Sequence, residues 1–492
     1  MKLEDLLQGI EVVARRGDAE PQIGHIACHT QKVQPATLFF ALRGAKSDGN
    51  KFVTSALEGG AVAIASEEAP PEGLAPGIAW IQVREGRKAL ATAAANFYGH
   101  PAQDLQLVAV TGTNGKTTTT HLLDSICRAS GASTGLFGTI AYHTPRGDYP
   151  APNTTPESLD LQRFLAEIRD GGGKYAALEA SSHALSMDRL WGCRFDAAVF
   201  TNLTREHMDY HKTFEDYFAA KRRLFEGTGA GKPAWGVVNT DDPYGARLAG
   251  LAEKTLTYGL EGSPDITTRK FQLSFAGLSF VAQTPAGKIP VESPFVGRIN
   301  VYNILAAVGA ALALGIPAEA MQAGIAKLGS VAGRFQRVEM GQPFLVVVDY
   351  AHTDDALENL MRTARELNPK GRVIILFGCG GEKDRTKRPV MGEVAGRLSD
   401  LAVVTSDNPR SEDPLKIISD IVVGLQKVQG KYAIEPDREK AIGLALDEAR
   451  AGDMVLLAGK GHEITQVLRE RTLAWSDDEK ARQALRQRGF GT

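Results

Sequence analysis

The sequence lacks several features that would each point to a particular class of protein. Cysteine is scarce, with 4 in 492 residues, and no C-x-x-C pair is present. This spacing fits reduced thiols in a cytoplasm better than a disulfide framework or a zinc site. An excess of charge of one sign is also lacking, because the net charge is −2 at pH 7. The sequence therefore offers no basic surface for nucleic acid.

Long hydrophobic runs are lacking as well. The most apolar stretch, residues 304–316, is too short to span a bilayer and predicts a buried helix. The opening MKLEDLLQGI carries acidic residues where a signal peptide needs a basic start and an apolar core. We therefore expect a cytoplasmic protein with no membrane partner. At roughly 150 residues per domain, the length predicts about three domains.

What the sequence does contain is a phosphate-binding pattern, LVAVTGTNGKTTTT, at residues 107–120. A glycine turn between a buried strand and a helix N-terminus aims backbone N–H groups and the helix dipole at one point, which suits phosphate. Lys116 would place its charge on the β- and γ-phosphates of ATP, and Thr117 would reach Mg²⁺. Val110 stands where the usual motif has its first glycine, so a turn without a ligand is the alternative. The residues of this turn predicted to bind ATP are Gly112, Thr113, Asn114, Gly115, Lys116, Thr117 and Thr118.

Short apolar strands alternate with helical stretches, which predicts an α/β fold with parallel sheets. We expect a small N-terminal α/β domain at residues 1–99, a central domain with the phosphate pattern at 100–332 and a C-terminal domain at 333–492. The first boundary rests on a Gly/Pro stop at 98–101. In the first domain, the polar loop 43–50 is either a connection or a binding loop.

Polar clusters follow the central strands predicted at residues 176–178, 197–200 and 234–238. Ligands bind such sheets beyond the carboxyl ends of the strands. Glu179 stands at the first of these ends and is a candidate Mg²⁺ ligand, because Mg²⁺ prefers carboxylate oxygen.

The segment REHMDYH places His207 and His211 four residues apart, a spacing that suits one helical face. A zinc motif would need H-E-x-x-H, and here the glutamate precedes the first histidine. Lys221 lies in YFAAKRRLF beside two alanines. It either faces inward or is a surface lysine, and periodicity alone does not decide between them.

The C-terminal domain shows the same arrangement of strands and polar clusters. Strands predicted at residues 344–348, 373–377, 401–404 and 454–457 run into DYAH, GCGGEKD, DNPR and GKGHE, respectively. This pattern predicts a second ligand-binding edge that faces the first.

Taken in chain order, these motifs resemble those of the Mur ligases. The resemblance rests on TGTNGKTTTT, NTT, EASSHAL, FTNLTREHMDYH, YFAAK, GRINVYNILAA, GRFQRVE, DYAHT, FGCGGEKDRTKRP, SDNPR and AGKGHE. It covers nearly the whole chain and is weakest in the first hundred residues. It implies a UDP-sugar-binding domain, a central P-loop ATPase-type domain and a C-terminal Rossmann-like domain that binds the amino acid.

The most similar members add meso-2,6-diaminopimelate to UDP-N-acetylmuramoyl-L-alanyl-D-glutamate in peptidoglycan precursor synthesis. The resemblance therefore implies an ATP- and Mg²⁺-dependent ligase that forms an acyl phosphate. Lys116, Lys221 and His207 are the implied catalytic residues. Thr117, Glu179, His207 and Lys221, the last as a carbamate, are the implied metal ligands.

The remaining implied contacts fall into three groups. The nucleotide would also meet Asn303, Arg334 and Asp349. The UDP-muramoyl dipeptide would meet Thr30, Gly44, Ala45, Lys46, Asn153, Thr154, Thr155, Ser181, Met187 and Arg189. Diaminopimelate would meet Lys383, Asp407, Asn408, Pro409, Arg410, Gly459 and Glu463.

Some of these positions depart from the family pattern. Thr30 replaces a serine, Met187 replaces a frequent glutamine, and Lys383 replaces an arginine, which keeps the charge but loses the bidentate fork. Asp354 stands where proline usually follows DYAHT. Arg410 follows the pattern and would pair with the second carboxylate of diaminopimelate, which L-lysine lacks.

Two other functions remain open at this point. One is a different amide ligase of the same fold, such as a folylpolyglutamate synthase or a Mur ligase of another step. The other is a nucleotide-dependent switch without ligase chemistry. The substrates expected are small molecules, and no oligomer is implied.

Overall fold

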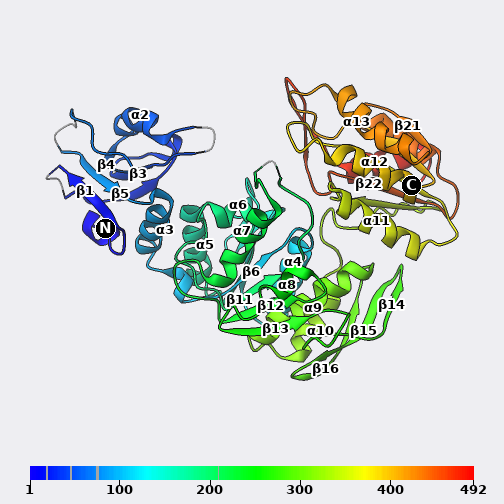
Figure 1. The fold of residues 1–492 in the computed structure, drawn as a ribbon, viewed down its shortest axis with the longest axis horizontal. Helices are drawn as coiled ribbons and strands as arrows, with labels where there is room; N and C mark the ends of the chain where they lie inside the picture. The colour runs from blue at the N-terminus through cyan, green and yellow to red at the C-terminus, as the bar shows by residue number, and fades with distance from the viewer. Residues whose placement is uncertain (18–19, 45–46, 74–76, 209, 492) are drawn as a thin grey trace.

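The computed structural model describes residues 1–17, 20–44, 47–73, 77–208 and 210–491. These residues form an α/β protein whose first and last domains lie at opposite ends of a central one (Figure 1). The predicted boundaries after residues 99 and 332 stay predictions.

The first domain is a sheet in the order β1-β5-β4-β3-β2. Among the described strands of this sheet, only β1 is antiparallel to its neighbour. The elements are α1 (Leu3–Leu6), β1 (Val12–Arg16), β2 (His25–Ala27), η1 (Thr30–Lys32), β3 (Thr37–Ala41), η2 (Gly49–Phe52), α2 (Val53–Glu58), β4 (Ala61–Ser66), β5 (Ala79–Val83) and α3 (Gly86–Phe97).

The central sheet has the order β13-β12-β11-β6-β10-β7-β8-β9. Its strands from β13 to β7 are parallel, and β8 and β9 extend it as antiparallel strands. The strands are β6 (Gln106–Thr111), β7 (Thr134–Phe137), β8 (Ala141–Thr144), β9 (Gly147–Pro150), β10 (Tyr175–Glu179), β11 (Ala197–Phe200), β12 (Trp235–Asn239) and β13 (Lys254–Tyr258).

Helices cover both faces of this sheet because successive strand residues point to opposite sides. Val108 and Val110 pack with α4, α9 and α10, whereas Leu107 and Ala109 pack with α5 and α7. The segment predicted as a buried helix at 304–316 is the end of α9 and the residues after it. The helices are η3 (Pro101–Gln103), α4 (Lys116–Ala129), α5 (Ser158–Asp170), α6 (Ser182–Ser186), α7 (Phe214–Glu226), α8 (Pro243–Ala246), α9 (Arg298–Ala313) and α10 (Ala318–Lys327).

A small antiparallel sheet, which the sequence did not predict, packs beside α10. It consists of β14 (Phe271–Ser274), β15 (Gly277–Thr284) and β16 (Gly287–Ser293). Buried and exposed residues alternate along β16, so one face joins the core and the other faces water.

The C-terminal domain is a sheet in the order β17-β18-β22-β19-β20-β21, and all its pairs except β17 with β18 are parallel. The four strands predicted from sequence are β18, β19, β20 and β22. The elements are β17 (Gln336–Arg337), β18 (Leu345–Asp349), α11 (Asp354–Leu367), β19 (Val373–Phe377), α12 (Lys387–Leu398), β20 (Leu401–Val404), α13 (Pro414–Lys427), β21 (Tyr432–Ile434), α14 (Arg438–Asp447), β22 (Met454–Ala458), β23 (Thr465–Val467), β24 (Thr472–Ala474) and α15 (Asp477–Gln487).

The first domain packs on the central one through α3 and α5 (Figure 1). Arg169 of α5 donates to the carbonyls of Tyr98 and Gly99. No helix among the described residues is both long enough and apolar enough to cross a membrane.

Candidate active site

The predicted phosphate turn connects β6 to α4, and Lys116 is the first residue of that helix. Gly112 and Gly115 adopt positive φ values of 146° and 87°. A Cβ at Gly112 would lie 1.9 Å from Thr201 Oγ1, and one at Gly115 would lie 2.4 Å from Asn303 Oδ1. Both positions therefore require glycine. In this structure the Lys116 ammonium donates to the carbonyls of Gly112 (3.0 Å) and Thr113 (2.7 Å).

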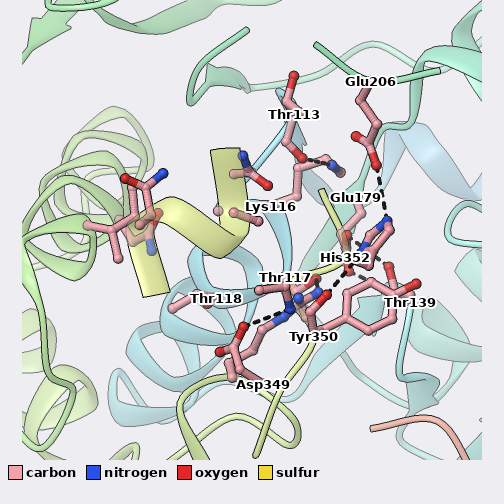
Figure 2. Close-up of a pocket in the computed structure, with 18 of the residues that line it drawn as sticks. Thr113, Lys116, Thr117, Thr118, Thr139, Glu179, Glu206, Asp349, Tyr350 and His352 are labelled. Carbon is pink, nitrogen blue, oxygen red and sulfur yellow. Dashed lines mark hydrogen bonds and ion pairs between the residues drawn. The ribbon is translucent and has the colours of Figure 1, made fainter. Parts of the chain in front are cut away.

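The turn opens into a pocket of about 240 Å³ whose walls come from the central and C-terminal domains (Figure 2). Most of the residues predicted to bind nucleotide or metal meet there. The predicted residues that line it are Thr113, Asn114, Gly115, Lys116, Thr117, Thr118, Thr154, Glu179, Ser181, His207, Lys221, Asn303, Arg334 and Asp349.

Contacts across this pocket join the two domains. Arg334 donates to Thr117 Oγ1 at 3.0 Å, and its guanidinium lies 4.6 Å from the centroid of the Tyr350 ring. Asn114 Nδ2 donates to Asp355 Oδ2 at 2.7 Å. Burial raises the pKa of Asp349, although Arg334 opposes that shift. A nucleotide on the turn would therefore meet side chains of both domains.

Glu179 ends β10 and is fully buried. Its two carboxylate oxygens accept from the Thr139 N–H at 2.8 Å and the Thr139 hydroxyl at 3.2 Å. Within the described residues, no group of three or more His, Cys, Asp or Glu side chains could hold a metal ion. Glu179 and the Thr117 hydroxyl instead fit Mg²⁺, which commonly binds through one or two carboxylates with waters and phosphate oxygens.

Lys221 faces inward, which decides between the two orientations that the sequence left open. It lies on α7, is 1% exposed, and donates to the Gly112 carbonyl at 2.8 Å. Its ammonium lies 4.4 Å from the centroid of the Tyr217 ring. Burial, and then the charge of Lys116, hold the pKa of Lys221 well below its ordinary value.

No described residue between His207 and His211 is assigned to a helix. His207 has φ 58°, which is not a helical value, and the His211 N–H donates to the His207 carbonyl. Burial lowers the pKa of His207 to about 4. His207 still lines the pocket, because the strand–loop connection after β11 carries it there.

Glu206 was not predicted as a site residue, although it stands in the REHMDYH motif. One of its carboxylate oxygens lies 3.6 Å from His207 Nε2 and the other 3.3 Å from His352 Nε2 of the C-terminal domain. Burial disfavours its charged form, but His207 and His352 outweigh this and lower the pKa of Glu206 (Figure 2). Glu206 and His352 lie in the two motifs REHMDYH and DYAHT. The sequence therefore contained both residues in recognised motifs, but it did not show that they pair.

Several residues predicted to bind the UDP-muramoyl dipeptide form one network beside Glu179. Thr155 donates to the Glu179 carbonyl at 2.6 Å and to Ser181 Oγ at 3.3 Å. Arg189 donates to the Thr155 carbonyl at 3.0 Å and pairs with Glu157 at 2.7 Å. Met187 Sδ lies 3.8 Å from the Arg189 guanidinium.

The last two residues predicted to bind the dipeptide, Asn153 and Thr154, lie beside this network. The Thr139 hydroxyl lies 3.3 Å from Thr154 Oγ1, and the Asn153 carbonyl accepts from Tyr142.

The structure describes only two of the four first-domain residues that we predicted to bind the UDP-muramoyl dipeptide. Thr30 and Gly44 line a second pocket, of about 490 Å³, together with Arg87 and Glu157. Ala45 and Lys46 lie outside the described residues. Glu157 belongs to the central domain, so this pocket extends toward the network around Arg189.

The residues predicted to bind the amino acid gather where β19, β20 and β22 end. Asn408 Nδ2 donates to Glu463 Oε2 at 2.8 Å. A Cβ at Gly459 would lie 2.7 Å from Asp407 Oδ2, and one at Gly380 would lie 3.2 Å from an Arg410 nitrogen and 3.8 Å from Lys383 Cγ. The last residue of the predicted set, Pro409, is buried.

The buried cations of this region, among them Lys460 and Arg388, were not selected by the sequence analysis. Lys460 and Arg388 have fully buried side chains. Arg388 pairs with Glu412, whose carboxylate accepts from the Glu382 N–H, and so it fixes the loop after β19 against the loop after β20. Lysine and arginine are rarely fully buried, so sequence alone gave no reason to select them.

The strand–turn–helix at residues 106–129 faces a second α/β domain across a shared pocket, an arrangement that suits a nucleotide-dependent enzyme. Residues 22–98 match the Mur ligase family catalytic domain, 110–311 the Mur ligase middle domain, and 333–461 the Mur ligase glutamate ligase domain. The chain belongs to the Mur ligase family.

Curated relatives match the whole length of the chain. One from Solibacter usitatus is 50% identical over 473 residues, covering 96% of this chain and 95% of that protein. Another, from Geobacter metallireducens, is 44% identical over 510 residues, covering 99% of each. Both are named UDP-N-acetylmuramoyl-L-alanyl-D-glutamate–2,6-diaminopimelate ligase.

Solved structures agree with the fold. A UDP-N-acetylmuramoyl-L-alanyl-D-glutamate–2,6-diaminopimelate ligase superposes with a TM-score of 0.67 at 32% identity and covers 99% of each chain. A MurF ligase from Thermotoga maritima in complex with ADP has a TM-score of 0.65 at 18% identity and covers 94% of this chain and 97% of that one. At that identity the second likeness concerns the fold alone.

Proposed function

We propose that the protein is an ATP-dependent ligase that adds meso-2,6-diaminopimelate to UDP-N-acetylmuramoyl-L-alanyl-D-glutamate in cytoplasmic peptidoglycan precursor synthesis. The observation that carries the proposal is the pairing of two sites on one C-terminal domain. That domain contributes Arg334 to the phosphate turn and Arg410, Asn408 and Glu463 to a polar cluster. One solved relative of the chain and its curated relatives bear the name of this reaction.

The reaction needs activation of a carboxylate, which is a poor acyl donor. In the first step the γ-carboxylate of D-glutamate attacks the γ-phosphorus of ATP, forms an acyl phosphate and releases ADP. In the second step the amine of diaminopimelate attacks the acyl carbon, loses a proton and expels phosphate. Two anions meet in the first step, so catalysis consists mainly of positioning and charge stabilisation.

Lys116 would supply charge to the transferring phosphoryl group, because it begins α4 at the phosphate turn. Its present partners are two carbonyls of the same turn, which a phosphate would replace. Arg334 and Asp349 would contact the nucleotide from the other domain. Mg²⁺, held by Thr117 and Glu179, would neutralise phosphate charge when bound.

Lys221 would act as a carbamate near His207 and support a second Mg²⁺. Its amine can capture CO₂ only when neutral, and burial favours that state by lowering its pKa. Deep burial of an unmodified ammonium near Lys116 is unfavourable, whereas a carbamate reverses the sign of the charge.

The dipeptide would lie along Thr154, Thr155, Ser181 and Arg189, with its uridine end toward Thr30 and Gly44. Arg410 and Glu463 would take the distal carboxylate and ammonium of diaminopimelate. The first amine would then face the acyl phosphate across the shared pocket.

The decisive assay measures ADP release from ATP with UDP-N-acetylmuramoyl-L-alanyl-D-glutamate, with and without meso-diaminopimelate. We expect release that depends on both substrates and a tripeptide product by mass spectrometry. D-Alanyl-D-alanine, L-lysine and L-glutamate with a folate serve as rival acceptors. Turnover with one of these alone would establish a different ligase, and ATP binding without acceptor-dependent release would favour a nucleotide switch.

A further inference from the structure

Lys460 is a fully buried lysine in the turn after β22, where its ammonium contacts two residues of the amino-acid cluster. Its side chain has 0% exposure, and Nζ lies 2.7 Å from Glu463 Oε2 and 3.1 Å from Asn408 Oδ1. An ammonium is costly to bury unless it is paired and hydrogen-bonded. Glu463 and Asn408 meet that requirement.

The same contacts orient Glu463. Its Oε2 accepts from both Lys460 and Asn408 Nδ2. Among the described residues no hydrogen bond engages Oε1, and the Glu463 side chain is 29% exposed. Glu463 therefore has one oxygen fixed by Lys460 and Asn408, whereas the other is available to a ligand.

A buried ion pair and close backbone packing hold the turn that carries Lys460. Arg438 and Asp477 form a buried ion pair at 2.6 Å, and Arg438 donates to the Ala458 carbonyl at 2.9 Å, at the end of β22. A Cβ at Gly461 would lie 2.7 Å from Tyr350 Cβ and 2.9 Å from the Gly333 carbonyl. The turn that carries Lys460 is thus held against both β22 and the edge of the nucleotide pocket.

We propose that Lys460 is a positioning residue for the amino-acid acceptor. It fixes Glu463 so that Oε1 meets a second ammonium group on the acceptor, and it thereby makes the site select a diamino acid. Because Lys460 already pairs with this carboxylate, Glu463 recognises the ammonium by geometry more than by net charge. The inference rests on the proposed function, since it concerns the acceptor of that reaction.

The test compares meso-diaminopimelate with 2-aminopimelate, which keeps both carboxylates and the carbon chain but lacks the distal amine. For Lys460→Met we expect kcat/KM to fall by ~10-fold or more with meso-diaminopimelate and by no more than ~2-fold with 2-aminopimelate. The KM for ATP should not change. Lys427→Met is the matched control, because Lys427 also pairs with a glutamate at 2.7 Å in this domain but is 68% exposed.

Glu463→Gln should lose the same discrimination, and the double variant Lys460→Met/Glu463→Gln should add little to either single one, because both residues act on one contact. If Lys460→Met does not fold, Lys460→Gln replaces it, and Glu463→Gln still tests the contact. Equal losses with both acceptors, additive effects in the double variant, or discrimination retained in Glu463→Gln would each overturn the inference. Wild-type enzyme that fails to use meso-diaminopimelate would instead refute the proposed function.

Discussion

Arg410 offers the sharpest test of acceptor selection. Its guanidinium donates to the Gly381 carbonyl at 2.6 Å through one nitrogen, and its backbone N–H donates to the Val467 carbonyl at 3.1 Å. A guanidinium has five N–H donors, so this contact leaves enough of them for a bidentate pair with a carboxylate. L-Lysine lacks that carboxylate and would leave the arginine desolvated and unpaired.

Loss of one partner of a buried charged hydrogen bond costs ~2–5 kcal/mol. Arg410→Ala should therefore lower kcat/KM for meso-diaminopimelate by at least ~10-fold and leave the KM for ATP unchanged. Arg410→Lys should give an intermediate loss, since it keeps the charge but not the fork. Arg362→Ala is the control, because Arg362 is 61% exposed on α11 and pairs with Glu358.

The backbone at Arg410 allows a loss of recognition to be separated from a loss of structure. Its φ of 53° lies in the left-handed region, which costs a residue with a Cβ about 1–2 kcal/mol. Arg410→Ala keeps this strain, whereas Arg410→Gly relieves it. We expect both variants to lose activity equally, with Arg410→Gly melting no lower than Arg410→Ala. Wild-type enzyme that uses L-lysine as well as meso-diaminopimelate would refute the selection argument, as would an Arg410→Ala variant with unchanged kcat/KM.

Four further predictions concern titratable residues of the pocket and of the C-terminal core. Lys116→Ala should abolish turnover with an unchanged melting curve, and near-normal activity would disprove its role at the phosphates. Lys221→Ala should be nearly inactive and partly rescued by acetate, which supplies a carboxylate; no rescue would count against the carbamate. Arg438→Met leaves Asp477 buried and unpaired, so urea titration should show a loss of about 3–5 kcal/mol, and a smaller loss would mean that Asp477 becomes solvated. Burial, and then Arg334, lower the pKa of His462 to about 4, so between pH 6.5 and 4 the unfolded chain takes up a proton that the folded one does not. The free energy of unfolding should therefore decrease as the pH is lowered from 6.5 to 4, and it should decrease less in His462→Gln. An equal dependence on pH in the wild type and the variant would refute this.

The apolar runs predicted the parallel strands well because burial on both faces leaves a continuous hydrophobic signal. The antiparallel strands β14, β15 and β16 gave no such signal. Intermediate and exposed residues alternate along β14, and buried and exposed residues alternate along β16, so neither forms a continuous hydrophobic run. The spacing of His207 and His211 suited one helical face, but the φ of 58° at His207 departs from helical geometry.

The part of the candidate site that could be predicted is the part whose residues lie together in one motif. The phosphate turn places its glycines, lysine and threonine in one stretch, and the structure keeps them together. Glu206, Arg388 and Lys460 were not predictable in this way. Glu206 pairs with His352 of the C-terminal domain, Arg388 pairs with Glu412 after another strand, and Lys460 contacts Asn408 after another strand as well as Glu463 in its own turn. A lone charged residue in a sequence normally indicates solvent exposure.

These contacts connect the two proposed binding sites of the C-terminal domain. The turn at Gly461 packs on Tyr350 and Gly333, next to Arg334, which reaches Thr117 of the phosphate turn. The same turn holds Lys460 and Glu463 at the acceptor cluster. In the proposed reaction, the nucleotide contact of Arg334 and the acceptor contacts of Lys460 and Glu463 would therefore lie on one domain, and Lys116 and Glu179 on the other. In the proposed reaction the amine must reach an acyl phosphate that water can also attack. Because one domain carries both Arg334 and Glu463, the domain arrangement that binds the nucleotide would also place the amine of the acceptor. The acyl phosphate would then meet this amine in the same arrangement that shields it from water.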